Sequence, residues 1–125
     1  MTQTTESSRP QHETINYLEL PSRDLDKTKA FFQAALGWEF ADYGPEYSAF
    51  ANAGIDGGFY LTDKILSTDN GSALLVLYSD NLEQTEATLI EAGASILKPV
   101  FSFPGGRRFH FADPNGNEYA VWSDG

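Results

Sequence analysis

The sequence of 125 residues contains no cysteine, so neither disulfide bonds nor thiolate chemistry is available to it, and nothing indicates secretion. It is also poor in basic residues, with 8 Lys and Arg against 18 Asp and Glu and a formal net charge of −10. A surface this acidic repels phosphate backbones and anionic membranes, so we expect no nucleic-acid or membrane partner. No apolar run approaches the length of a membrane span.

The residues that are present favour one folded domain. Hydrophobic residues make up 41% of the chain and nine of them are Phe, which is enough for a real core. The first residues, MTQTTESSRPQHE, are polar and lack the apolar segment of a signal peptide. We therefore expect residues 1–12 to form a flexible N-terminal tail, residues 13–125 to form a single domain, and the protein to be cytoplasmic.

The first half of the chain shows strand, helix and strand patterns in that order. Alternating side chains predict a strand at 14–20. A helix is predicted over 24–36, since Asp24 suits its N-cap and Gly37 its end. Gly, Pro and Asn then separate three short strand candidates, at 38–43, 47–52 and 57–63.

The second half repeats this order. A strand is predicted at 72–79, where a nearly continuous apolar run indicates burial on both faces. A helix at 82–93 and strands at 95–101, 107–113 and 117–123 follow. The period from Asp24 to Asn81 is about 57 residues, so the sequence predicts an α+β fold of two βαβββ modules, about 13–70 and 71–125.

Two segments carry a family resemblance. DLDKTKAFFQAALGW (24–38) and FHFADPNGN (109–117) resemble the opening helix and the late hairpin of the vicinal oxygen chelate superfamily, which includes glyoxalase I, bleomycin-resistance and fosfomycin-resistance proteins and extradiol dioxygenases. The resemblance implies the glyoxalase/bleomycin-resistance fold, in which two tandem βαβββ modules form a U-shaped open mixed sheet around a cavity. It also implies a homodimer.

The same resemblance shows where metal-using members hold their ion. The matched positions in this chain are Tyr17, Leu74, Ala120 and the strand around 57–60, which has no carboxylate. Leu74 and Ala120 cannot bind a metal, whereas Tyr17 suits only a ferric ion. Glu118 shares a face with Ala120, but two residues of strand displace its carboxylate by roughly 6.6 Å. We therefore expect no metal and no other cofactor; a divalent metal is the less favoured alternative.

Strand alternation and the resemblance together suggest which side chains line the cavity. The candidate catalytic residues are Glu19 and His110, which are able to exchange protons. Three alternatives stay open: an ion pair of Glu19 with Arg108, a purely structural role for His110, and a Glu118 that is solvated beyond the turn. The loop 101–106 is either a hairpin turn or an aromatic flap. The candidate ligand-binding residues are Tyr17, Tyr60, Phe103, Arg108, Glu118 and Trp122.

Three functions are compatible with these residues. The first is metal-independent binding of a small, largely apolar or aromatic molecule in the cavity, with the acidic surface favouring a cationic compound. The second is an enzyme of lyase, isomerase or dioxygenase type, either metal-free through Glu19 and His110 or with an atypical metal site. The third is a structural or regulatory dimer that binds no ligand.

Overall fold

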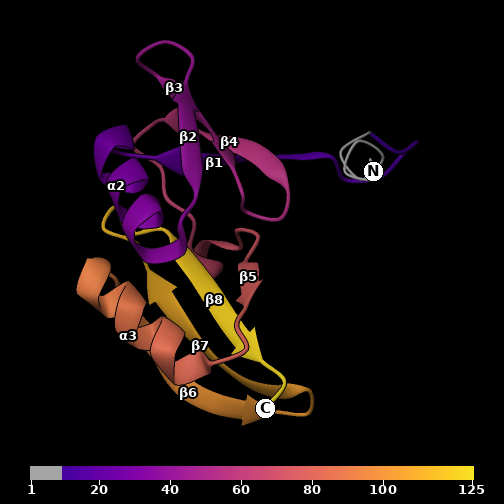
Figure 1. The fold of residues 1–125 in the computed structure, drawn as a ribbon. Coiled ribbons are helices and arrows are strands. Elements are labelled where there is room, and N and C mark those ends of the chain that lie inside the picture. The colour runs from indigo at the N-terminus through magenta and orange to yellow at the C-terminus, as the bar shows by residue number, and fades with distance from the viewer. Residues whose placement is uncertain (1–9) are drawn as a thin grey trace.

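The computed structural model describes residues 10–125 and contains two helices, eight strands and one short 3-10 helix (Figure 1). The elements of the first half are β1 (Tyr17–Ser22), α2 (Leu25–Leu36), β2 (Glu39–Asp42), β3 (Tyr47–Ala51) and β4 (Asp56–Leu61). The connecting segment carries η1 (Thr68–Asn70). The second half contains β5 (Leu75–Tyr78), α3 (Leu82–Ala92), β6 (Ser95–Phe103), β7 (Gly106–Ala112) and β8 (Glu118–Ser123).

The strands form two four-stranded mixed sheets of identical topology. Sheet A has the order β1-β4-β3-β2 and sheet B the order β5-β8-β7-β6, so the first strand of each module lies beside its last strand. That pair is parallel in both sheets, and the other pairs are antiparallel. Each sheet has one helix on one face and two free edges, which confirms the α+β fold of two tandem βαβββ modules (Figure 1).

Both helices begin and end at the residues that the sequence indicated. The side chain of Asp24 accepts a hydrogen bond from the Lys27 N–H, and the side chain of Asn81 accepts one from Gln84. At the other end of α2, Gly37 adopts a φ of 72°; its N–H donates to the Gln33 carbonyl, and the Trp38 N–H donates to the Phe32 carbonyl. A left-handed residue of this kind is usually glycine, because a Cβ is strained there.

The internal repeat extends to individual hydrogen bonds. At the end of β1 the hydroxyls of Ser22 and Thr28 lie 2.8 Å apart, and at the end of β5 those of Ser79 and Thr85 lie 2.7 Å apart. Both pairs are separated by 57 positions (79 − 22 and 85 − 28), which is the predicted period. Each serine ties the end of a strand to the first turn of the helix that follows, so the two modules enter their helices in the same way.

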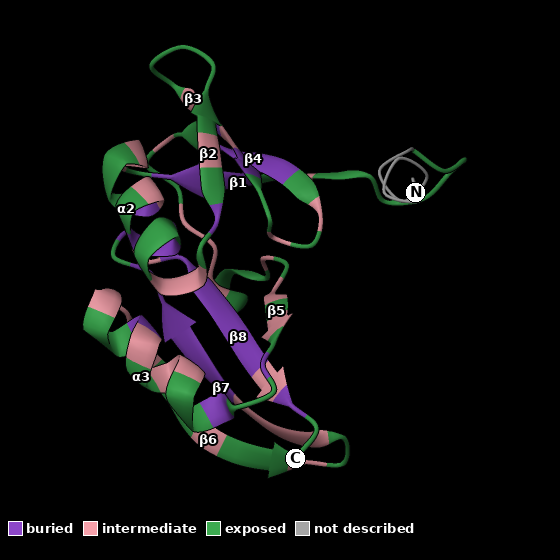
Figure 2. Ribbon diagram, in the orientation of Figure 1, coloured by how far each residue is buried: buried purple, intermediate pink, exposed green. Residues whose placement is uncertain are grey.

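An aromatic core lies between the helices and the sheets. The Phe32 ring stacks on Trp38, with 4.4 Å between ring centroids, and on Phe59 at 5.7 Å. The edge of Phe32 also meets Tyr119 of β8 at 5.5 Å. Burying an aromatic ring of this size contributes about 2–3 kcal/mol. Figure 2 shows β7 and β8 as the most buried strands, so the core is continuous from the first module into the second.

The turn between β7 and β8 joins the two modules. Asp113 accepts hydrogen bonds from the backbone N–H groups of Asn115 and Asn117 at 2.9 and 3.0 Å, which closes the turn. The Asn115 amide donates to the Thr28 hydroxyl at 2.7 Å, and the Asn117 amide donates to the Pro21 carbonyl at 2.7 Å. Burial raises the pKa of Asp113, although its hydrogen bonds oppose that shift. This turn is therefore structural, and it fixes where β8 begins.

One sequence prediction about burial is wrong. The strand predicted at 72–79 was expected to be buried on both faces, but β5 is an edge strand and Val76 and Tyr78 are 44% and 54% exposed. Leu75 and Leu77 pack against the core cluster, whereas the face that carries Val76 and Tyr78 is exposed among the described residues. The apolar run at 72–79 therefore corresponds to a strand with one face in the core and one apolar face exposed.

The predicted tail is only partly described. Residues 1–9 lie outside the described residues, and residues 10–12 are exposed ahead of β1. Within residues 10–125, neither helix has the length and apolar character that crossing a membrane requires.

We expect Asn115→Ala to lower the free energy of unfolding by about 1–3 kcal/mol, because it leaves the part-buried carbonyl of Asp24 and the buried hydroxyl of Thr28 without their amide donor. Urea unfolding followed by tryptophan fluorescence measures the change. Asn70→Ala is the matched control, because Asn70 is exposed and its loss is expected to cost less than about 0.5 kcal/mol. Equal effects of the two substitutions would contradict the bridging role of Asn115.

Candidate functional site

The face of sheet B opposite α3, here the open face of sheet B, carries the predicted site residues of the second module. In the register of β7 and β8, Arg108 lies opposite Trp122, and His110 lies opposite Ala120. The alternate residues Phe109 and Phe111 belong to the core on the helix side. Because side chains alternate along a strand, the polar residues of β7 point away from α3.

Four residues on this face form a continuous hydrogen-bonded series, here the polar chain: Thr68, Glu118, His110 and Arg108. One carboxylate oxygen of Glu118 accepts from the Thr68 backbone N–H at 2.8 Å and from its hydroxyl at 3.0 Å. The other oxygen lies 2.8 Å from His110 Nδ1, and His110 Nε2 lies 2.9 Å from an Arg108 guanidinium nitrogen. A guanidinium only donates, so Nε2 accepts, and the network assigns the proton to Nδ1.

The middle of the polar chain is buried. His110 is 2% exposed and Glu118 is 6% exposed, so the carboxylate is not solvated beyond the turn. Burial alone raises the pKa of Glu118, and it is the largest single influence. The hydrogen bonds from Thr68 and His110 together outweigh it, so the pKa of Glu118 lies below its ordinary value. The charged carboxylate is therefore the form that the fold stabilises.

Arg108, at the outer end of the polar chain, has donors to spare. Its Nε is the one side-chain nitrogen or oxygen among residues 10–125 that is buried without a hydrogen-bond partner. The rings of Phe101 and Phe103 lie 5.6 and 6.0 Å from the guanidinium carbon, a cation–π arrangement. Lys98 faces His110 in the register of β6 and β7 and adds a second positive charge. A cationic, aromatic patch thus stands on a protein of net charge −10.

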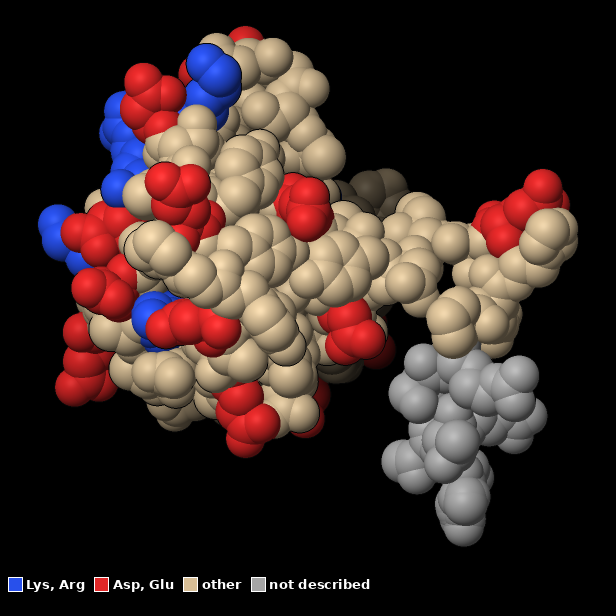
Figure 3. Space-filling model, turned by 90° about the horizontal axis from the view of Figure 1, so that it is seen from above, with Lys and Arg blue, Asp and Glu red and all other residues tan. Residues whose placement is uncertain are grey.

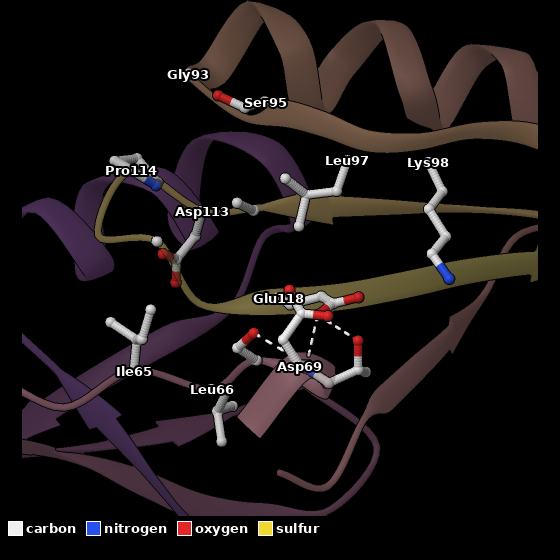
Figure 4. Close-up of a pocket in the computed structure, with 14 residues that line it drawn as sticks. Ile65, Leu66, Asp69, Gly93, Ser95, Leu97, Lys98, Asp113, Pro114 and Glu118 are labelled. Carbon is white, nitrogen blue, oxygen red and sulfur yellow. Dashed lines mark hydrogen bonds between the residues drawn. The ribbon is translucent and has the colours of Figure 1, made fainter. Parts of the chain in front are cut away.

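A cavity of about 770 Å³ opens beside the inner end of the polar chain (Figure 4). In the close-up, Leu97 and Lys98 point from β6 toward the strand that carries Glu118. The segment before β5 supplies the opposite wall with Ile65 and Asp69. This volume is in the range of small-molecule sites.

The corresponding face of sheet A, opposite α2 and here the open face of sheet A, carries tyrosines and carboxylates. The Tyr47 hydroxyl lies 2.7 Å from that of Tyr17 and donates to Glu19 at 3.0 Å. Burial, followed by these two contacts, raises the pKa of Tyr47. The Tyr47 ring requires glycine at Gly58, where a Cβ would come within 2.3 Å of its hydroxyl oxygen. A second cavity of about 510 Å³ on this module is lined in part by Tyr17, Glu39, Tyr43 and Asp56.

The structure brings some predicted site residues together and separates others. Arg108, His110 and Glu118 are in direct contact, and Trp122 lies 6.3 Å from Phe103 between ring centroids. The other three stand on sheet A: Tyr17 and Glu19 share the Tyr47 contact, and Tyr60 lies opposite Tyr47 in the register of β3 and β4. The Glu19–Arg108 pair considered from the sequence is not formed within residues 10–125, since Glu19 bonds Tyr47 and Arg108 bonds His110.

A sequence model of the glyoxalase/bleomycin resistance protein/dioxygenase superfamily matches residues 14–121, which include both modules. The chain belongs to this superfamily. No curated protein sequence gives a match. The confirmed membership agrees with the resemblance carried by the helix 24–38 and the turn 109–117.

Solved structures share the superfamily fold with this chain at low sequence identity. An enzyme of the superfamily from Burkholderia phytofirmans PsJN has a TM-score of 0.71 at 18% identity, covering 86% of this chain and 96% of its own. TnmS3, an antibiotic binding protein from Streptomyces sp. CB03234, has a TM-score of 0.66 at 20% identity, covering 92% and 98%. The fosfomycin resistance protein FosX from Listeria monocytogenes, as an E126Q mutant complexed with Mn(II) and 1S,2S-dihydroxypropylphosphonic acid, has a TM-score of 0.74 at 18% identity, covering 90% of each.

The superfamily positions that hold a metal in other members do not fit one here. Ala120 is fully buried and has no donor atom, and Leu74 is apolar. Tyr17 already contacts Tyr47, and Gly57 and Gly58 of β4 have no side chain that could donate to a metal. Across residues 10–125, no three side chains of His, Cys, Asp or Glu gather into a group able to hold an ion.

Sequence reasoning missed three residues of the site. Thr68 lies in the segment between the modules, 50 positions from Glu118, and no local pattern marks it as a partner. Tyr47 meets Glu19 only because β1 and β3 both pair with β4. Lys98 belongs to a predicted strand and lies opposite His110 in the register of β6 and β7. Its place on the open face follows from that register, which the sequence does not show.

The lowered pKa of Glu118 predicts a pH-dependent stability. Its contribution is present above the ordinary carboxyl pKa and is lost as the pH falls through the lower, folded-state value. The difference in unfolding free energy between the wild type and Glu118→Gln should therefore be greatest near pH 7 and shrink toward pH 3. Urea unfolding at a series of pH values measures it.

Glu91→Gln is the control for this series, because Glu91 is exposed on α3. Its difference from the wild type should stay near zero at every pH. A difference for Glu118→Gln that does not change between pH 7 and pH 3 would contradict a stabilised carboxylate.

Proposed function

We propose that this protein binds a small, largely apolar or aromatic organic molecule without the superfamily metal ion. The observation that carries this proposal is the open face of sheet B, where aromatic rings surround a guanidinium with an unused buried donor. Ligand sites are mostly apolar with a few convergent polar groups, and this face has that composition beside a cavity of about 770 Å³. The bound molecule would contact Phe101, Phe103, Arg108 and Trp122, which lie on the open face and are not among the residues that line this cavity.

A second copy of the chain is proposed to complete the cavity. Both open faces expose large apolar side chains, including Tyr17 and Tyr60 on sheet A and Val76 and Tyr78 on sheet B. The two faces also differ in charge, because Glu19, Glu39 and Asp56 lie on sheet A whereas Lys98 and Arg108 lie on sheet B. Placing sheet A of one copy over sheet B of the other covers the apolar side chains and pairs opposite charges.

One of the structural neighbours supports sequestration as the role of such a site. TnmS3 is described as an antibiotic binding protein, whereas the FosX structure contains Mn(II) and gives no support for metal-free binding. Binding without chemistry needs no metal, and the matched positions of this chain offer no donor set for one. The surface seen from above is rich in acidic side chains, with the basic ones mostly at one margin (Figure 3). That distribution attracts cations to the outer surface, whereas the open face of sheet B itself carries Lys98 and Arg108.

A second candidate function, metal-free proton transfer, rests on the His110–Glu118 contact of 2.8 Å. A carboxylate that orients a histidine is a common arrangement in general acid–base catalysis. In this structure Nε2 accepts from Arg108, so proton transfer requires that Arg108 move to the substrate first. Exchange of an activated C–H for deuterium in a bound compound, followed by NMR in D₂O, tests this function. Exchange that is unchanged in His110→Asn would exclude it.

Ligand binding should appear as thermal stabilisation. We expect at least one compound in a panel of glycopeptide drugs, aromatic metabolites and thiol conjugates to raise the melting temperature of the full chain. A ligand at 100 times its Kd adds about 2.7 kcal/mol to the free energy of unfolding. Phe101→Ala should reduce that shift, whereas Ile90→Ala, which removes an exposed apolar side chain from α3, should leave it unchanged.

The same panel tests metal independence. Protein purified without chelator should contain far less than one Mn, Fe, Ni or Zn ion per chain, and EDTA should leave the ligand-induced shift unchanged. One bound ion per chain, or loss of the shift in EDTA, would overturn the metal-free proposal. A panel in which no compound stabilises the protein would count against ligand binding itself.

The proposed dimer predicts a mass of two chains in light scattering coupled to size-exclusion chromatography. Tyr78→Glu should convert it to a monomer, because it places a charge on the apolar open face of sheet B. Ile90→Glu is the control on α3 and should remain dimeric. A wild-type protein that elutes as a monomer at high concentration would refute the arrangement.

A further inference from the structure

Arg108 holds more hydrogen-bonding capacity than the chain uses. A guanidinium carries five N–H donors in a fixed plane, and one of them reaches His110 Nε2 at 2.9 Å. Nε is buried and unpartnered, and no carboxylate among residues 10–125 forms an ion pair with Arg108. A buried donor without an acceptor is unfavourable, and a ligand oxygen would supply one once the side chains that cover Nε shift to admit it. Two oxygens in one plane match the edge of a guanidinium best.

We propose that Arg108 anchors a carboxylate of the ligand, and that Thr68, Glu118 and His110 are positioning residues that hold its guanidinium in place. This inference rests on the proposed function, because it names the chemical class that the same site takes. The ligand class is an aromatic carboxylate: the planar oxyanion lies along the guanidinium edge, and the ring packs against Phe101 and Phe103.

The polar chain accounts for the orientation of Arg108. Glu118 is fixed first, because one of its oxygens accepts two hydrogen bonds from Thr68. Its other oxygen accepts from His110 Nδ1, and this leaves Nε2 as the acceptor that faces Arg108. Without the carboxylate, His110 is free to carry its proton on Nε2, where it would point at a guanidinium donor. Glu118 thus acts on Arg108 through the tautomer of His110.

The local charge favours an anion despite the acidic protein. Arg108 and Lys98 stand on the same face of sheet B, and the Glu118 carboxylate on that face is already held by Thr68 and His110. The remaining acidic charge is spread over the surface, where it is screened beyond about 8 Å at physiological ionic strength. Trp122, opposite Arg108 in register, extends the aromatic wall that a ring would pack on.

The test compares two probes of equal shape, 2-naphthoate and 2-naphthamide, titrated into the full chain by calorimetry. Naphthoate should bind the wild type at least about tenfold more tightly, because its hydrogen bonds to a guanidinium are charge-assisted. Arg108→Gln should bring the affinity ratio of the two probes to about one. Arg107→Gln is the matched control on the same strand, since Arg107 faces Glu83 instead, and it should keep the wild-type ratio.

The positioning role is tested by the same ratio. Glu118→Gln and Thr68→Val should lower the preference for naphthoate while binding of naphthamide changes little, and a residue that only supports the fold would weaken both probes alike. ¹⁵N NMR of His110 should show the Nδ1–H tautomer in the wild type and its loss in Glu118→Gln. An unchanged ratio in both variants would overturn the positioning role.

Failure of the inference and failure of the proposed function give different results. Equal binding of the two probes would overturn the carboxylate class while leaving ligand binding in place. Binding of neither probe would overturn the aromatic carboxylate class, and the thermal-shift panel would then decide ligand binding separately. A tenfold preference for naphthoate that persists in Arg108→Gln would show that the carboxylate binds elsewhere, and it would overturn the assignment to Arg108.

Discussion

The carboxylate of Asp113 accepts hydrogen bonds from the backbone of its own turn, and this closed turn presents two amide side chains to the other module. Asn115 and Asn117 reach the end of β1 and the first turn of α2, so a local turn becomes the joint between the halves of the chain. The amide oxygen of Asn117 also accepts from Leu66, which holds the connecting segment. Without this joint, β8 would not start where Glu118 meets Thr68.

The site depends on that joint in a direct way. Thr68 belongs to the connecting segment, and Glu118 is the first residue of β8, so the hydrogen bonds between them exist only when the segment is docked. A buried carboxylate is costly unless its oxygens have donors, and here both have them. Thr68 of the connecting segment donates to one Glu118 oxygen, and His110 of β7 donates to the other. Folding of the module joint and ordering of the site are therefore one process.

The two modules have the same topology but different surfaces. The repeat preserves the caps and the Ser–Thr contacts that enter each helix, because those hydrogen bonds serve the βαβββ module itself. The open faces are under no such constraint, and one carries tyrosines and carboxylates while the other carries Lys98, Arg108 and aromatic rings. The two modules therefore share their internal hydrogen bonds and differ in the charge of their open faces, which is the difference on which the proposed pairing of two copies rests.

Local patterns in the sequence determined the elements of this protein, their order and their repeat. Caps such as Asp24 and Gly37, and the turn after Asp113, act within a few residues, so they are readable without a structure. Alternation also placed Arg108, His110 and Glu118 on one face correctly. Only the tertiary structure decided that Glu118 is buried, that Thr68 holds it, that Glu19 bonds Tyr47 instead of Arg108, and that β5 is exposed on one face. Those outcomes depend on strand register and on contacts between residues 28 or 50 positions apart. Hydrophobic periodicity reports only on neighbouring residues, so it cannot predict such contacts.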